Sequence, residues 1–334
     1  MAGPAVPQDG ELQLGAVTLP AGRRIIPDGH DEPVAWVTRR EVTDPGAVWS
    51  ALSDLHPETG LVPILLDPGE DEEDFFFIDP CDVTELDHLD AGQLLAARWH
   101  GDPESDDGGK ADQEWGWETR RVNDFLGLKQ RGEGGNSLAE IVGAVLRTVT
   151  NPEINAELDR LSELDRRDAG VNLDERAEAE RQEAAERVSA NPFPGLAPAT
   201  DGSLSSAQRA AVLSAIPPAR LGLVPARRPA DALAVAGWCA FDDPAYGDGI
   251  RNALWIGIVL RSWETRFGAR LLNVGPGAEI KLLVQRPPRT PETAMRIAAE
   301  HHAFCDECAG LGLRSVNEIS AVLVDAPVWT FWWD

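Results

Sequence analysis

The sequence predicts an α+β protein. Its C-terminal part is expected to form a mixed or antiparallel sheet with helices on one face, in a split β-α-β-like arrangement. Two observations support this prediction. Short apolar segments typical of strands alternate along the chain with amphipathic segments typical of helices. In addition, two strand-like segments flank a Gly-Pro-Gly turn near residue 276. A smaller N-terminal α+β unit and a helical arm complete the predicted fold.

Composition divides the 334 residues into four segments. Residues 67–124 contain nineteen acidic and four basic side chains, whereas residues 220–334 contain thirteen and twelve. A Pro/Gly-rich stretch begins at residue 191. These differences predict four parts: an N-terminal α+β unit (1–100), an acidic loop with a charged helical insert (101–190), a Pro/Gly linker (191–219) and a C-terminal α+β domain (220–334).

The N-terminal unit is expected to hold two strands and two helices. The alternating and continuous apolar segments at 33–38 and 61–67 are typical of strands. Between them, residues 44–56 have helical spacing, and Asp44 is a candidate N-cap. Residues 85–100 indicate a further helix, and residues 137–189 have the mixed charge pattern of a solvated helical arm.

The C-terminal domain has the clearest pattern of elements. Thr290 followed by Pro291 is typical of a helix start, Ser315 with Glu318 has the spacing of a capping box, and Gly268 is a helix stop. The expected elements are a strand (220–226), a short helix or turn (231–238), a helix (252–267), two strands (269–275, 279–285), two helices (290–305, 315–325) and a closing strand (327–334).

The stretch "HHAFCDEC" at 301–308 concentrates residues that could carry chemistry. Helical spacing places His301, Cys305 and Cys308 on one face, which otherwise looks buried. Three interpretations follow. The residues pack in the core, which the sequence favours because free cysteine is usually buried; or they bind zinc with a fourth ligand from elsewhere; or His301 and Cys305 form a catalytic pair assisted by Glu300 or Glu264.

The aromatic C-terminus is a candidate binding surface. If the strand alternates, Trp329, Phe331 and Trp333 face one side and Trp332 faces the other. Such a strand is either sandwiched between two layers or forms an aromatic groove that docks a peptide or ligand. The candidate binding residues are therefore Trp329, Phe331, Trp332, Trp333, Arg261 and Arg266.

The arginines of this region have two interpretations. Arg261 and Glu264 are three residues apart on a predicted helix and could form a solvated ion pair. Alternatively, the arginines at 226–229, 260–270 and 285–289 together bind an anion or an acidic partner.

Several functional classes lack support. The sequence has no P-loop, no dinucleotide-binding glycine motif, no nucleophile elbow and no HExxH motif, so we expect no cofactor. The net charge of −26 disfavours nucleic acid, and no apolar run is long enough to span a membrane. The N-terminus lacks a signal-peptide pattern and the four cysteines are scattered. A cytoplasmic location is therefore expected.

Residues 220–334 resemble a bacterial domain-of-unknown-function family, the one numbered 4253. The segments that carry this resemblance are "GLVPARRPADALAVAGW" (222–238), "VLRSWETRFGAR" (259–270), "RPPRTPETAMRIAAEHHAFC" (286–305) and "FWWD" (331–334). The family's Glu-His-x-Ala-Phe-Cys core is matched by Glu300, His301, Ala303, Phe304 and Cys305. Because His302 and Cys308 are outside that core, the resemblance weakens the zinc interpretation. It implies no established activity.

Taken together, these features favour a non-enzymatic protein-binding module of the immunity or regulatory type. The uneven charge suggests that an acidic N-terminal surface masks a basic protein partner, and the chain lacks a convincing catalytic set. The alternatives are an enzyme that uses His301 and Cys305, or a zinc-stabilised structural domain.

Overall fold

The computed structural model describes residues 5–27, 29–66, 80–99, 193–238, 249–275, 279–305 and 316–332. The predicted helical arm at 137–189 and most of the acidic segment lie outside these residues. Within them, seven α-helices accompany one eight-stranded mixed sheet, so the predicted α+β class is confirmed. No helix of the described part is long and apolar enough to cross a membrane.

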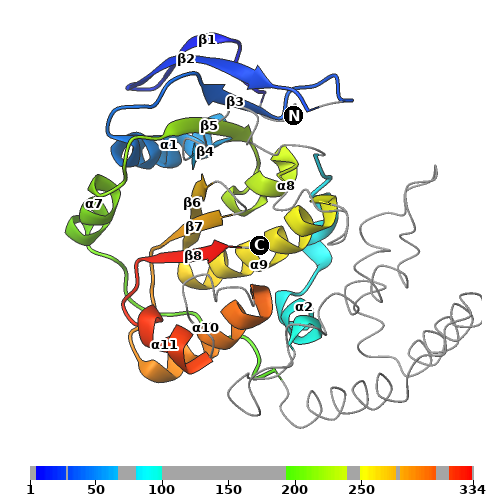
Figure 1. The fold of residues 1–334 in the computed structure, drawn as a ribbon, viewed down its shortest axis with the longest axis vertical. Coiled ribbons are helices and arrows are strands. Elements are labelled where there is room, and N and C mark those ends of the chain that lie inside the picture. Colours follow the sequence, from blue (N-terminus) through cyan, green and yellow to red (C-terminus); the bar gives the residue numbers. More distant parts are fainter. Residues whose placement is uncertain are drawn as a thin grey trace, which may run out of the picture.

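One sheet runs through the molecule, in the order β1-β2-β3-β5-β4-β6-β7-β8. Figure 1 shows the strands following one another from β1 at the top down to β8. Neighbouring strands are antiparallel except β4 and β6, which are parallel. The strands are β1 (Gly10–Leu14), β2 (Val17–Ile25), β3 (Ala35–Thr38), β4 (Leu61–Leu66), β5 (Arg220–Pro225), β6 (Ala269–Gly275), β7 (Glu279–Val284) and β8 (Val328–Trp332).

Strand β5 joins the two ends of the sequence. It begins the segment predicted as the C-terminal domain, yet it lies between β3 and β4 of the predicted N-terminal unit. An additional bridge joins Val42 to Ala219, and the Leu221 amide donates to the Thr38 hydroxyl at 3.0 Å. Strands from residues 1–100 and from residues 220–334 therefore form the same sheet.

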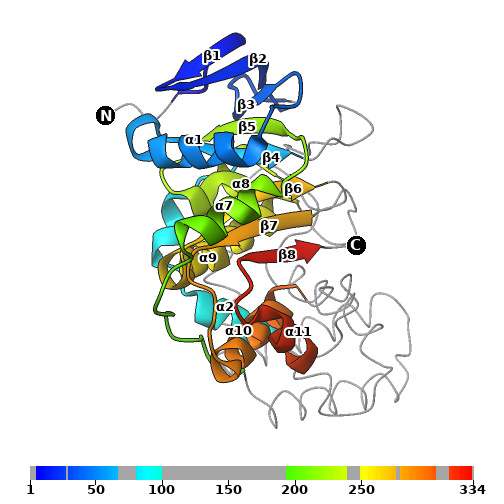
Figure 2. The ribbon, with the colours of Figure 1, turned by 90° about the vertical axis from the view of Figure 1, so that its left-hand side faces the viewer.

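Helices cover both faces of the sheet, and each face has its own hydrophobic core. Helices α1 (Pro45–Thr59) and α7 (Ser206–Ser214) pack on one face, and Figure 2 shows them in front of the strands. The other face is covered by α2 (Ala91–Arg98), α8 (Ala232–Ala236), α9 (Gly249–Phe267), α10 (Pro291–Phe304) and α11 (Val316–Leu323), with the 3-10 helices η1 (Thr84–His88) and η2 (Pro229–Asp231). The helices that follow β5 thus share one face, as predicted for the C-terminal sheet.

The predicted C-terminal elements occur in the predicted order. Thr290 caps α10 by accepting from the Thr293 amide, and Pro291 occupies the first turn. Gly268 ends α9 with a positive φ of 62°, a conformation that suits glycine. Ser315, the predicted cap of α11, lies outside the described residues.

Several N-terminal details differ from the prediction. Residues 85–100 do not form one helix, because the Asp90 side chain caps a new one by accepting from the Gln93 amide. Asp44 does precede α1, but its side chain forms no capping hydrogen bond. The hairpin β1–β2 was not predicted, and α7 lies within the stretch predicted as a linker.

The docking of α7 on α1 yields a prediction about Gly46. A Cβ atom at this position would come within 2.1 Å of the Leu213 carbonyl oxygen of α7. Backbone cannot move as a flexible side chain can, so Gly46→Ala should lower the free energy of unfolding by about 1–3 kcal/mol despite alanine's better helix propensity. The urea midpoint measures the change.

Ala47→Ser is the matched control, because Ala47 is exposed on the same turn. It should change stability by a few tenths of a kcal/mol. Equal midpoints for Gly46→Ala and the wild type would show that α7 does not pack against α1 as described.

Candidate functional site

Helix α10 carries two of the candidate catalytic residues, Glu300 and His301, and the third, Cys305, is its C-cap. Its apolar positions Ala294, Ile297 and Ala298 recur at helical spacing and face the core, as predicted. The same face continues into Glu300 and His301, which are both buried. Two ionisable side chains inside a core need a structural explanation, and their contacts provide it.

The His301 imidazole lies among aromatic rings. Its ring centroid is 5.1 Å from that of Trp263 on α9, 4.6 Å from that of Trp329 and 4.7 Å from that of Phe331, both on β8. The side chain is 3% exposed, and burial lowers its pKa to about 3. Its Nε2 atom has no hydrogen-bond partner among the described residues. A neutral ring that packs edge-on against aromatic neighbours accounts for this environment.

Cys305 is buried where α10 ends. Its thiol Sγ donates to the Trp332 carbonyl oxygen at 3.1 Å, which ties the end of the helix to β8. Cys308 lies outside the described residues, and the part of the chain that is described contains no group of three side chains able to bind a metal. The zinc interpretation therefore stays a prediction.

Glu300 is the centre of a buried hydrogen-bond network. Arg266 of α9 donates to both carboxylate oxygens, at 2.7 and 2.6 Å, in a bidentate ion pair. The Trp263 indole adds a bond of 2.7 Å and the Ala197 amide one of 2.6 Å. A buried carboxylate that accepts hydrogen bonds from four donor atoms is held rigidly in place. We call these four residues the Glu300 clamp; it joins α9, α10 and the segment before α7.

Helical spacing predicted an ion pair between Arg261 and Glu264, but Arg261 has other partners in the structure. Its guanidinium instead binds both oxygens of Asp231, at 2.5 and 2.9 Å, and Asp87 at 2.9 Å. Asp231 belongs to η2 and comes from outside the helix, so helical spacing could not reveal it. Arg261 and Arg266 are thus both engaged inside the fold. Glu264 lies 3.9 Å from Arg228, and burial raises its pKa.

Strand β8 has two different faces. Trp329 and Phe331 are buried against α9 and α10, as the predicted alternation requires. The other face carries Val328, Thr330 and Trp332, which are all half-buried. Trp332 lies opposite Glu279 of β7. Trp333 lies outside the described residues.

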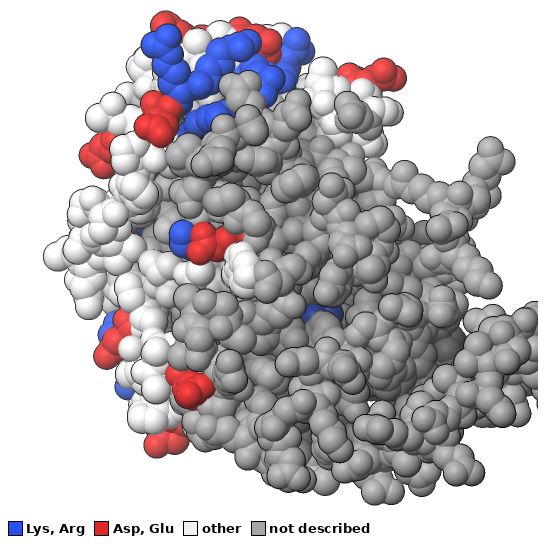
Figure 3. Space-filling view, viewed as in Figure 1, with Lys and Arg blue, Asp and Glu red and all other residues white. Residues whose placement is uncertain are grey.

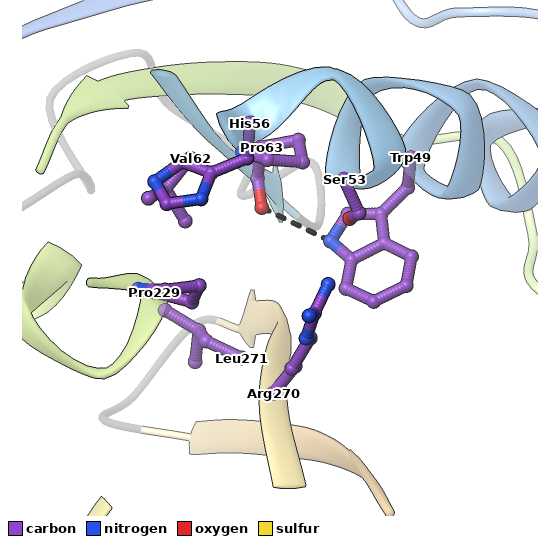
Figure 4. Close-up of a pocket in the computed structure, with 8 residues that line it drawn as sticks. All are labelled: Trp49, Ser53, His56, Val62, Pro63, Pro229, Arg270 and Leu271. Carbon is purple, nitrogen blue, oxygen red and sulfur yellow. Dashed lines mark hydrogen bonds between the residues drawn. The ribbon is translucent and has the colours of Figure 1, made fainter. Parts of the chain in front are cut away.

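A small pocket, which the sequence did not predict, lies between α1 and β6 (Figure 4). The lining residues come from α1, β4, η2 and β6, and are Trp49, Ser53, His56, Val62, Pro63, Pro229, Arg270 and Leu271. Because these positions come from distant parts of the sequence, no local motif marks them.

Basic side chains gather at the top of the molecule in Figure 3, over strands β2 and β3. Arg23 and Arg24 lie on β2, and Arg39 and Arg40 follow its antiparallel neighbour β3. They are the four basic residues of the first 66. The acidic surface predicted for this end of the chain depends mainly on residues 67–124, most of which lie outside the described part, so it stays a prediction.

Comparison with known proteins identifies the class of the C-terminal part. Residues 220–334 match the family model called Domain of unknown function (DUF4253), which confirms the resemblance seen in the sequence. The match begins at β5 and includes α9, α10 and β8, and therefore the Glu300 clamp except Ala197. No curated protein and no solved structure matches the chain.

The environment of His301 predicts a pH dependence of stability. Its pKa is about 3 in the folded protein against an ordinary value of 6.5. Between pH 3 and pH 6.5 this imidazole is protonated in the unfolded chain but neutral in the folded protein. The free energy of unfolding therefore falls as the pH drops below about 6.5. At pH 5 the loss from this residue should be about 2 kcal/mol relative to neutral pH.

His301→Gln isolates this contribution, because glutamine does not titrate. Urea unfolding of both proteins at pH 7.5 and pH 5 should show a smaller pH-dependent loss for the variant. If both proteins lose the same free energy between the two pH values, the imidazole is already exposed to protons in the native state, contrary to the structure.

Proposed function

We propose that this protein is a non-enzymatic protein-binding module of the immunity or regulatory type, and that its partner is a basic protein. The observation that carries the proposal is the position of β8. It is the last strand of the sheet in the described part of the chain, and it pairs with β7 along one side. A strand in this position can accept an extended segment of another protein as a further strand.

Trp332 supplies a side chain suited to such an interface. It is half-buried on the face of β8 that points away from Trp329 and Phe331. Tryptophan is enriched among the residues that dominate binding energy, because it covers a large apolar area and still presents a hydrogen-bond donor. Its main-chain carbonyl is held by Cys305, so this end of the strand is ordered before binding.

Charge supports a basic partner. Residues 67–124 carry nineteen acidic and four basic side chains. Such a segment accelerates the approach of a basic surface and makes the affinity depend on salt. The short-range contact at β8 and the long-range attraction are expected to act together.

The enzymatic alternative has less support. A catalytic His301 would need access to substrate, yet its ring is enclosed by three aromatic side chains. Glu300, the proposed helper, already accepts four hydrogen bonds from Arg266, Trp263 and Ala197. Both residues are explained by the stability of the α9–α10 core.

The proposal is tested with the full chain as bait in a native lysate, followed by purification of any stoichiometric partner. Affinity for the pure partner is then measured for the wild type and for Trp332→Ala. We expect the variant to bind at least about tenfold more weakly, since hot-spot tryptophans contribute roughly 2 kcal/mol or more. Raising the salt concentration should also weaken binding.

Val322→Ala is the control, because Val322 on α11 is 53% exposed and its loss removes apolar surface outside β8. It should bind as the wild type does. A partner that binds Trp332→Ala with unchanged affinity would place the interface elsewhere, and a bait that captures no partner would count against a binding module.

A further inference from the structure

Strand β8 is attached to the sheet along one side only. Its residues pair with β7, and no other strand in the described part of the chain pairs with it. Its remaining attachment is the packing of Trp329 and Phe331 against α9 and α10. Separating β8 therefore disrupts one backbone ladder and one aromatic cluster, whereas separating a central strand such as β4 disrupts two ladders.

His301 lies at the centre of that aromatic cluster. Of the three aromatic rings around its imidazole, Trp329 and Phe331 come from β8 and Trp263 comes from α9. The His301 Nε2 atom and the Trp329 indole nitrogen are both buried, and neither has a hydrogen-bond partner among the described residues. Leaving a buried polar atom without a partner costs free energy that contact with water would restore. The cluster thus contains two groups that gain hydrogen bonds when β8 moves away.

The folded structure provides no counter-charge for a protonated His301. Glu300, its neighbour on α10, is paired with Arg266 of α9, and β7 faces this core with apolar side chains such as Ile280 and Leu282. Burial is the only cause of the lowered pKa of His301, so no charge in the described part offsets it. An imidazolium enclosed here would be a buried, unpaired charge, which is very costly. The ring therefore takes up a proton only when water reaches it.

From this arrangement we propose that β8 is a pH-sensitive strand: proton uptake by His301 releases β8 from β7 and from the α9–α10 core, while β1 to β7 stay paired. Release removes two of the three aromatic neighbours of the ring, so water can hydrate the imidazolium. The central strands do not have to open. Release of β8 therefore costs less free energy than global unfolding does.

Release also removes the edge to which a partner strand would bind. Trp332 belongs to β8, and the Cys305 thiol holds its carbonyl oxygen only while the strand is in place. Acid conditions should therefore dissociate the partner, and this consequence alone rests on the proposed function. The release itself is a property of the isolated chain and is tested without any partner.

The test is hydrogen exchange of the full-length protein, measured by mass spectrometry at pH 7.5 and pH 5 and corrected for the intrinsic exchange rate at each pH. Amides of β8 should be about 30-fold less protected at pH 5, because the released imidazole regains its ordinary pKa of 6.5 and each pH unit below that value favours the open form about tenfold. Strand β8 should also be less protected than β4 at both pH values. Strand β1, at the other end of the sheet, can open without uncovering His301 and should show no pH effect.

Two variants assign the effect to His301. His301→Gln cannot be protonated and should lose the pH dependence of β8 protection, whereas His302→Gln, which removes the neighbouring histidine of α10, should keep it. The proposal is overturned if β8 is as protected as β4 at pH 5, if β8 protection is the same at both pH values, if β1 loses protection in parallel, or if both variants respond as the wild type does. If His301→Gln does not fold, the comparison of β8, β4 and β1 in the wild type decides.

Discussion

The insertion of β5 between β3 and β4 is the constraint on which the rest of the structure depends. Each residue of β5 has a partner on β4, and β3 pairs with it from the other side. Leu221, Leu223 and Val224 are buried on the two faces of the sheet. Without β5, the inner edges of β3 and β4 would keep unpaired backbone groups inside the core, which is costly. The first 66 residues and the matched domain are thus parts of one hydrogen-bonded sheet.

The other features follow from that junction. Helix α1, which connects β3 to β4, is brought over β6, so Ser53 and His56 face Arg270 across the pocket. On the opposite face, α9 and α10 are locked by the Glu300 clamp, which also fixes the chain at Ala197 before it continues to α7. The clamp and the aromatic rings around His301 together explain why Glu300 and His301, which the sequence offered as candidate catalytic residues, lie in a rigid core.

Local signals in the sequence predicted local structure well. The start of α10 at Thr290 and the end of α9 at Gly268 depend on neighbouring residues, so their positions can be deduced from the sequence. The buried face of α10 was likewise predicted by its spacing. The hairpin β1–β2 was missed because its short apolar alternation is interrupted by Gly15 and Pro20 and resembles a loop.

Long-range partners could not be predicted in the same way. Arg261 was matched to Glu264 by helical spacing, but a closer and more buried carboxylate, Asp231, comes from another element. Arg266 was predicted as a candidate binding residue, because no local pattern in the sequence indicates its pairing with Glu300. Arg270, from the same stretch, is exposed on β6. Tertiary packing decides which of these three arginines enters a buried ion pair, since each has the same local pattern.

The most direct test of this account is the folding of its two halves. Fragments 1–219 and 220–334 are produced separately, and their near-ultraviolet circular dichroism is recorded alone and after mixing. Because β5 completes the sheet of the first fragment and takes both neighbours from it, we predict that neither fragment alone shows native signals and that mixing restores them. A fragment 220–334 that folds cooperatively by itself would contradict the account.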